Sequence, residues 1–126
     1  MNIVDSSGWL EYFADGPNAD LFAAPLGNSA ELLVPSITLY EVFKTVCRQR
    51  GEDAALQAVA MMQQGKVVEL SSSIALLAAK LSLDVKTPMA DSIILATARI
   101  HAAVLWTQDK DFEGLSDVRY FPKAES

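Results

Sequence analysis

The sequence predicts an α/β fold with a mostly parallel sheet of four to five strands and helices on both faces. Short runs of apolar and β-branched residues recur along the chain, and segments with helical spacing separate them. Strands that alternate with helices in this way form βαβ units, which build parallel sheets. No internal repeat, low-complexity block or Pro/Gly/Ser-rich linker divides the 126 residues, so we expect residues 1–126 to form a single domain.

Two strands and four helices are expected in the first half of the chain. Residues 2–4 are apolar and partly β-branched, as in a buried strand, and Ser6 or Ser7 can cap the helix that follows. Glycines at positions 51 and 65 end two longer helical segments. In chain order we expect a strand at 2–4, a helix from the two serines to the break at 15–18, a helix from Asp20 to Pro25 or Gly27, a strand at 31–34, and helices at 37–50 and 52–63.

The second half is expected to add three strands and two helices. Serines at 71–73 can cap the first of these helices, and Pro88 suits the first position of the second. The apolar segment before Pro122 is typical of an edge strand. In chain order we expect a strand at 67–70, a helix from the serines to about Leu83, a helix from Thr87–Pro88 to Ala102, and strands at 103–106 and 118–121.

Composition and charge limit the class of protein. Ten basic against 16 acidic residues give a net charge of −6, which argues against holding nucleic acid by bulk positive charge. No apolar stretch is long enough to span a membrane, and the N-terminus lacks the basic and apolar regions of a signal peptide. The single cysteine, Cys47, excludes an internal disulfide and a cysteine-rich zinc site. We therefore expect an acidic, cytoplasmic protein with no membrane contact.

Acidic residues follow the expected strands at one edge of the sheet. Asp5 follows the first strand, Asp109 and Asp111 follow the fourth, and Glu41 lies in the first turns of the helix after the second. Asp91 lies in the first turn of the helix that leads into the fourth strand, and it joins the others if that helix is oriented alike. Ligands of open parallel sheets bind beyond the carboxyl ends of the strands. We therefore expect these carboxylates to converge there.

A cluster of carboxylates predicts a bound cation. Neighbouring carboxylates repel one another and raise one another's pKa unless a positive charge neutralises them. Oxygen ligands alone favour Mg²⁺ or Mn²⁺ over zinc, and the chain has one histidine, His101, and one cysteine, Cys47. We expect neither of these two residues to be catalytic.

Four segments, in order along the chain, resemble the signature segments of the PIN domain. They are residues 3–7, 35–42, 90–98 and 105–112, and the resemblance extends from Asp5 to about Phe121. Among PIN domains they are most similar to the VapC-type toxin ribonucleases of prokaryotic toxin–antitoxin systems. The chain departs from the usual pattern at Gln108, where an arginine often stands, and this puts a phosphate contact at that position in doubt.

This resemblance implies a Mg²⁺-dependent endoribonuclease in which Mn²⁺ can substitute. Such an enzyme cleaves structured RNA, such as a tRNA or rRNA loop, with a metal-activated water, and leaves 3′-hydroxyl and 5′-phosphate ends. The resemblance also implies a homodimer that is inhibited by a cognate VapB-like antitoxin. Part of the aromatic set at residues 9, 12 and 13 would then lie in the groove that the antitoxin fills, and the rest would lie in the core.

The resemblance also implies roles for individual residues. The acidic quartet of catalytic residues and metal ligands is matched by Asp5, Glu41, Asp91 and Asp109, with Asp111 as an auxiliary acid. Asp5 and Asp91 would be the principal ligands, and Glu41 and Asp109 would act through water. Ser6 and Thr107 would hold carboxylates in place from outside the ligand set. Lys44 and Arg48 lie on one helix face after Glu41 and would contact RNA phosphates.

Each of these residues also has a purely structural interpretation. Asp5, Asp109 and Asp111 could cap the segments that follow them, and Asp91 could interact with a helix dipole. Glu41 could complete a capping box with Thr38, although Ser36 is an equally plausible cap. Lys44 and Arg48 could form local salt bridges on a solvated face.

Two other functions remain open at this point. One is a catalytically inactive PIN-like binding or scaffold module, against which the complete acidic quartet argues. The other is a phosphorelay receiver domain, which has the same length and α/β pattern. A receiver needs paired acids after its first strand and a lysine after its last core strand, whereas this chain has Asp5-Ser6-Ser7 and Lys110 between two acids.

Overall fold

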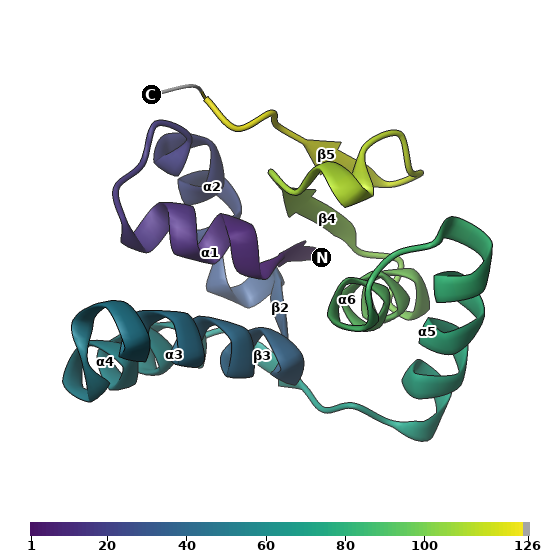
Figure 1. Ribbon diagram of the computed structural model, residues 1–126, viewed down its shortest axis with the longest axis horizontal. Coiled ribbons are helices and arrows are strands. Elements are labelled where there is room, and N and C mark those ends of the chain that lie inside the picture. The colour runs from purple at the N-terminus through teal and green to yellow at the C-terminus, as the bar shows by residue number, and fades with distance from the viewer. Residues whose placement is uncertain (125–126) are drawn as a thin grey trace.

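The computed structural model describes residues 1–124 and contains five strands and six α-helices in that range (Figure 1). The longest helix has 15 residues, and none of the helices in this range is long and apolar enough to cross a membrane. The elements are β1 (Asn2–Val4), α1 (Ser6–Phe13), α2 (Ala19–Leu26), the 3-10 turn η1 (Ser29–Glu31), β2 (Leu32–Pro35), α3 (Ser36–Arg50), α4 (Glu52–Met62), β3 (Lys66–Val68), α5 (Ser72–Val85), α6 (Met89–Ile100), β4 (Val104–Thr107), the 3-10 turn η2 (Lys110–Phe112) and β5 (Val118–Tyr120).

The five strands form one sheet in the order β3-β2-β1-β4-β5, and every pair of neighbours is parallel. The predicted α/β class, the parallel sheet and the upper value of five strands are therefore confirmed, and β5 lies at an edge as expected. The central strand β1 pairs with β2 on one side and with β4 on the other. Because all strands run in one direction, their carboxyl ends and the residues that follow them meet at one edge.

Helices cover both faces of the sheet, and side chains alternate between two cores. Ile3 and Leu105 point to the face covered by α5 and α6, whereas Val4 points to the opposite face with Trp9 and Phe22. This alternation follows from the two-residue period of a strand. Figure 1 shows α5 and α6 on one side of the strands and α1 to α4 on the other.

The caps of three helices differ from those predicted. The N-cap of α1 is Asp5 and not Ser6 or Ser7, so the capping interpretation of Asp5 is confirmed: its side chain accepts a hydrogen bond from the Gly8 backbone N–H (2.9 Å). The capping box at Thr38 and the alternative cap at Ser36 are both wrong. Helix α3 begins at Ser36 directly after Pro35, and the Thr38 hydroxyl donates to the Pro35 carbonyl instead (2.7 Å).

The third cap concerns the helix that carries Asp91. Pro88 is its N-cap and not its first helical residue, so α6 begins one position later than predicted, at Met89. The remaining boundaries shift by a few residues at most; for example, β3 covers Lys66–Val68 instead of residues 67–70, and α5 continues to Val85. Such shifts are normal at frayed ends, and they leave every acidic residue at its expected place relative to the sheet.

Gly8 permits the close approach of α1 to the sheet, and replacing it should destabilise the protein. A Cβ atom at this position would lie 2.5 Å from Val4 Cγ1 and 2.8 Å from Phe22 Cε1. Gly8→Ala should therefore lower the free energy of unfolding by about 1–3 kcal/mol, because overpacking outweighs the gain in helix propensity. Urea denaturation measures this change. Gly27→Ala is the matched control, because the nearest atom there, the Ala23 carbonyl oxygen, lies at 3.2 Å. Equal stability of the two variants would contradict this account of the packing.

Candidate metal centre

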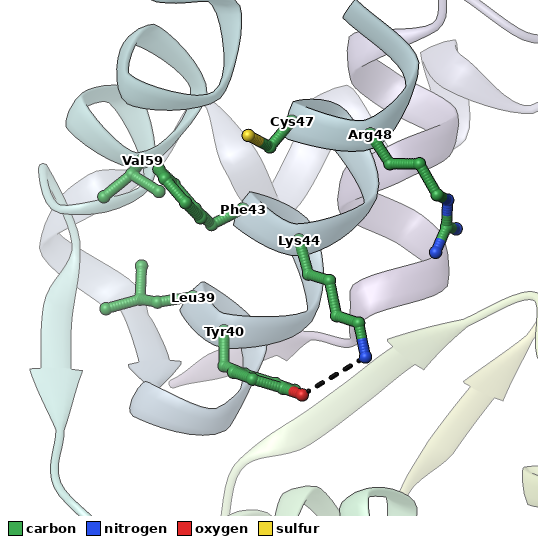
Figure 2. Close-up of a pocket in the computed structure, with 7 residues that line it drawn as sticks. All are labelled: Leu39, Tyr40, Phe43, Lys44, Cys47, Arg48 and Val59. Carbon is green, nitrogen blue, oxygen red and sulfur yellow. Dashed lines mark hydrogen bonds between the residues drawn. The ribbon is translucent and has the colours of Figure 1, made fainter. Parts of the chain in front are cut away.

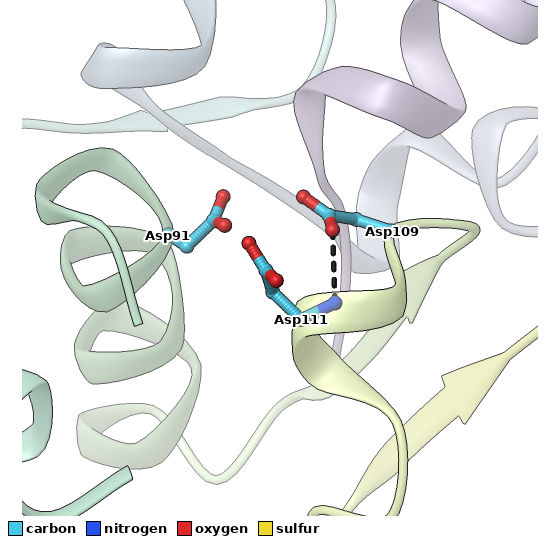
Figure 3. A group of neighbouring side chains, drawn as sticks. All are labelled: Asp91, Asp109 and Asp111. Atoms are coloured by element: carbon cyan, nitrogen blue, oxygen red, sulfur yellow. Dashed lines mark hydrogen bonds between the residues drawn. The ribbon is translucent and has the colours of Figure 1, made fainter. Parts of the chain in front are cut away.

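Three carboxylates meet at the edge where the parallel strands end. Asp91 comes from the first turn of α6, Asp109 follows β4, and Asp111 lies in η2. One oxygen atom from each lies within 4.8 Å of the others, and Figure 3 shows the three side chains directed toward one another. Asp109 also caps η2 by accepting from the Asp111 backbone N–H (2.9 Å), so the expected capping role is present alongside the clustering.

Asp5 is buried beside this group and is held by several hydrogen bonds. Its side chain is 2% exposed. The Thr107 hydroxyl donates to Oδ2 (2.7 Å), and the Ser7 hydroxyl lies 2.7 Å from Oδ1 and 2.9 Å from Oδ2. Burial raises the pKa of Asp5 from its ordinary value of 3.8 to about 6, and the charge of Asp109 adds to this, although the bonds from Thr107, Ser7 and Gly8 lower it.

The pKa of Asp91 is raised further, to about 8. Burial is the largest cause, followed by the charge of Asp109 and by hydrogen bonding with Asp111, and the charge of Asp5 also contributes. Within residues 1–124 the one salt bridge joins the N-terminal ammonium of Met1 to Glu31 (3.5 Å). No lysine or arginine in that part of the chain therefore neutralises the cluster. A set of carboxylate oxygens with no basic partner has the chemistry that a divalent cation requires.

Glu41 lies outside the group of three carboxylates. It is half-buried on α3 and accepts a hydrogen bond from the Ser6 hydroxyl (2.6 Å) at the start of α1. Of the five acids considered from the sequence, the structure thus brings three within 4.8 Å, places Asp5 close enough for its charge to act on Asp91, and ties Glu41 to Ser6. The group of three contains Asp111, which was expected to be auxiliary, and not Asp5.

One residue that sequence reasoning missed takes part in the site, and one that it singled out does not contact the cluster through its side chain. Ser7 was considered only as a helix cap, yet its hydroxyl contacts both oxygens of Asp5 and lies 3.5 Å from the Thr107 hydroxyl. Its position two residues after an acidic N-cap was the available signal, because hydroxyl side chains there commonly bond locally. Gln108 is 6% exposed and its side chain binds Asn18 (3.0 Å). It is therefore buried in a protein contact and not presented to solvent for phosphate.

Lys44 and Arg48 lie on the exposed face of α3, at an apolar groove (Figure 2). The groove has a volume of about 700 Å³ and is lined on its apolar side by Leu39, Phe43, Cys47 and Val59. The Lys44 ammonium donates to the Tyr40 hydroxyl (3.3 Å) and lies 5.5 Å from the centre of its ring. The predicted alternative of local salt bridges for Lys44 and Arg48 is not seen within the described chain.

The remaining side chains considered from the sequence have structural surroundings. His101 is exposed at the end of α6, where Nδ1 lies 3.0 Å from the Thr97 carbonyl oxygen. Trp9 is buried in the core and stacks on Phe13, with 5.7 Å between the ring centres, and Tyr12 meets Phe13 edge to face. Within residues 1–124, the histidine bonds to the main chain of its own helix and the rings contact one another, and none of them bonds to the acidic cluster.

Comparison with known proteins identifies the family. The family model of the PIN domain matches residues 3–118. Comparison with curated protein sequences finds no match. A toxin–antitoxin complex from Klebsiella pneumoniae has a similar structure, with a TM-score of 0.78 and 25% identity over 94% of this chain and 96% of that chain.

Two further structures share the fold at lower identity. One is the sarcin–ricin loop cleaving toxin VapC20 of Mycobacterium tuberculosis, with a TM-score of 0.75 and 18% identity over 94% of this chain and 99% of that chain. The other is a DNA-bound VapBC complex from Salmonella typhimurium, with a TM-score of 0.74 and 15% identity over 97% and 98% of the two chains. A PIN domain sets aside the receiver alternative, since the family model covers nearly the whole sequence. The chain belongs to the PIN-domain family and has the fold of the VapC-type toxins.

Proposed function

We propose that this protein is a Mg²⁺- or Mn²⁺-dependent endoribonuclease toxin of a toxin–antitoxin system. The observation that carries the proposal is the meeting of three carboxylates, with Asp5 beside them, at the carboxyl edge of a PIN-domain sheet. Such a cluster is electrostatically costly unless a cation binds there, and the raised pKa values of Asp5 and Asp91 express that cost. The reaction would leave a 3′-hydroxyl and a 5′-phosphate on the RNA.

The residues of the site divide into ligands and residues that orient them. Asp91, Asp109 and Asp111 would hold the cation, with Asp5, whose charge acts on Asp91, as a further ligand. A bound divalent cation supplies charge neutralisation at the phosphate and lowers the pKa of coordinated water. Thr107 and Ser7 keep the Asp5 carboxylate in one rotamer by donating to it.

Glu41 has a separate place in this scheme. Its hydrogen bond to Ser6 fixes its carboxylate at the start of α1, outside the group of three. From there it would act through water, by orienting the attacking molecule or accepting its proton. Lys44 and Arg48 on α3 would contact phosphates that flank the cleaved bond.

The proposed protein and RNA partners are based on solved structures that share this fold. Solved structures with this fold include toxin–antitoxin complexes from Klebsiella pneumoniae and Salmonella typhimurium. We extend this relationship to the present chain and propose a VapB-like antitoxin that covers the acidic cluster and blocks cleavage. We also propose that residues 1–126 act as one nuclease domain, as a homodimer in the cytoplasm. A structured RNA is the proposed substrate because VapC20, which shares the fold, cleaves the sarcin–ricin loop.

Cleavage of a total small-RNA pool by purified, antitoxin-free protein tests the proposal. Wild type should produce discrete fragments with Mg²⁺ and with Mn²⁺, and none with EDTA. An Asp5→Asn protein, prepared in the same way, should produce none under any condition, which controls for contaminating nuclease. Asparagine is as good an N-cap as aspartate, so this variant should keep helix α1 intact.

The opposite outcome has a definite meaning. If wild type and Asp5→Asn leave the RNA pool alike, while both are folded and saturated with metal and ribosomal RNA is included in the pool, the enzymatic proposal is wrong. The inactive PIN-like binding module would then be the function to pursue. Sequencing of fragment ends in the positive case identifies the RNA and the cleaved bond.

A further inference from the structure

A polar cluster next to the acidic residues joins α1 and α2 to the segment that follows β4. It consists of Glu11 on α1, Asn18 at the start of α2 and Gln108 after β4, and we call it the Gln108 clamp. The Asn18 side-chain amide donates to Gln108 Oε1 (3.0 Å) and to the Pro122 carbonyl (3.0 Å). The Asn18 backbone N–H donates to Glu11 Oε2 (2.7 Å), and Gln108 Nε2 donates to Glu11 Oε1 (3.4 Å).

The members of the clamp satisfy one another, and its two amides are buried whereas Glu11 is half-buried. Gln108 is 6% exposed and Asn18 is 8% exposed. Buried amides are costly unless their donors and acceptors are paired, and here one amide oxygen, two amide donors and both oxygens of a carboxylate find partners within the cluster. Networks of this kind fix a single side-chain arrangement, because any other rotamer leaves a buried group without a partner.

The clamp is connected to the acidic cluster through the main chain of Gln108. The Gln108 backbone N–H donates to the Ser7 hydroxyl (3.3 Å), and that hydroxyl contacts both oxygens of Asp5. The next residue after Gln108 is Asp109, whose backbone N–H donates to the Thr107 hydroxyl (2.8 Å). Displacement of the Gln108 side chain would therefore act on Asp5 and on Asp109 together.

We propose that Glu11, Asn18 and Gln108 are positioning residues that fix the loop after β4 against α1 and α2, and thereby hold Asp109 and Asp5 in register for cation binding. This inference rests on the proposed function. A position at which the family often has arginine serves in this chain as an internal anchor, because the buried amide of Gln108 is committed to Asn18 and Glu11. Asn18 acts from the opposite end of the clamp, through the loop between α1 and α2.

The test compares full-length Gln108→Ala and Asn18→Ala proteins with wild type. The matched control is Gln57→Ala, which removes the same side chain from the exposed face of α4. Three quantities are measured: the Mn²⁺ dissociation constant by calorimetry, kcat and KM for RNA cleavage, and the exchange rates of the Asp109 and Asp111 amide protons in metal-free protein. The last readout requires neither metal nor substrate.

Both clamp variants should bind Mn²⁺ about tenfold more weakly, in line with other changes behind metal ligands. The same loss should appear in kcat with little change in KM, and the Asp109 and Asp111 amides should exchange about tenfold faster. Gln57→Ala should match wild type in all three. If Gln108→Ala does not fold, Asn18→Ala decides the question, because it removes the other partner of the same bond.

A charge-conserving exchange separates positioning from stability. In the Glu11→Gln/Gln108→Glu double variant, the carboxylate at 108 can accept from Asn18 and from the new amide at 11, so the pattern of bonds is regenerated. Gln108→Glu alone brings two carboxylates together and should be the most impaired, whereas the double variant should recover Mn²⁺ binding to within about threefold of wild type.

Two other outcomes would contradict either the clamp inference or the proposed function. If Gln108→Ala melts earlier but keeps the Mn²⁺ affinity, kcat and amide exchange of Gln57→Ala, the clamp is merely structural and the inference is wrong. If wild type neither binds Mn²⁺ nor cleaves RNA, the proposed function fails. The amide exchange of Asp109 then still decides whether the clamp orders this loop.

Discussion

Replacing Asp91 by asparagine should abolish RNA cleavage and cation binding and, at the same time, stabilise the metal-free protein. Burial and the charges of Asp109 and Asp5 raise the pKa of Asp91 to about 8. Ionised Asp91 therefore destabilises the folded metal-free protein. Loss of a ligand should lower cleavage by more than about a hundredfold, since changes behind the ligands already cost about 10–100-fold. The neutral amide removes the cost of burying a carboxylate and its repulsion from Asp109, so unfolding should require about 1 kcal/mol more, a modest gain because Asp91 is partly exposed.

Thermal unfolding with EDTA and a Mn²⁺ titration measure the two effects separately. Asp84→Asn is the matched control, because Asp84 is an exposed acid on α5 and should change neither quantity. A destabilised Asp91→Asn protein would mean that the carboxylate has a structural partner in the folded chain. Full activity in a folded Asp91→Asn protein would remove Asp91 from the ligand set.

Stability and cation affinity should respond to pH in opposite directions. Folding raises the pKa of Asp5 from 3.8 to about 6 and that of Asp91 from 3.8 to about 8. The folded chain therefore retains protons that the unfolded chain has released, and the metal-free protein should lose stability progressively as the pH rises from about 4 to 8. Above pH 8 these two groups should add no further loss.

Cation binding displaces the same protons, so Mn²⁺ affinity should rise across this range. Between pH 6 and 8 Asp91 is still protonated in the metal-free protein, and each cation that binds displaces this proton. The association constant for Mn²⁺ should therefore increase by about tenfold per pH unit and level off above pH 8. Calorimetric titrations at pH 5.5, 7 and 8.5 measure this, and Asp84→Asn, which removes an exposed acid on α5, should follow the wild-type profile. An affinity independent of pH would show that the carboxylates are already ionised in the metal-free protein.

The βα pattern was enough to place most of the acidic residues. Asp5 and Asp109 follow β1 and β4, and parallel neighbours necessarily bring such residues to the same edge. The position of Asp91 needed an assumption, because its helix follows another helix and not a strand. The assumption was correct because α6 leads directly into β4 and the chain reverses direction between them. The last turn of α6 therefore lies near the start of β4, and its first turn lies at the edge where β4 ends.

Side-chain contacts between distant segments could not be predicted in the same way. The contact of Ser7 with Thr107 and the bond between Asn18 and Gln108 each join residues about a hundred positions apart. Pattern reasoning fixes which edge of the sheet a residue occupies, but a rotamer depends on partners that the sequence does not pair. The capping box at Thr38 failed for a local reason: α3 already begins at Ser36, so Thr38 lies inside its first turn, where the hydroxyl donates to the Pro35 carbonyl.

Asp5 combines two duties in one side chain, since it caps α1 through the Gly8 N–H and carries buried charge beside the cluster. Asparagine can take over the first duty and not the second. Codons for aspartate and asparagine differ by a single base, so one point mutation at this position would remove the charge and leave the helix cap in place. If the protein is the proposed toxin, a cell that loses the antitoxin would survive with such an allele, and the gene would persist as an intact reading frame that encodes an inactive protein.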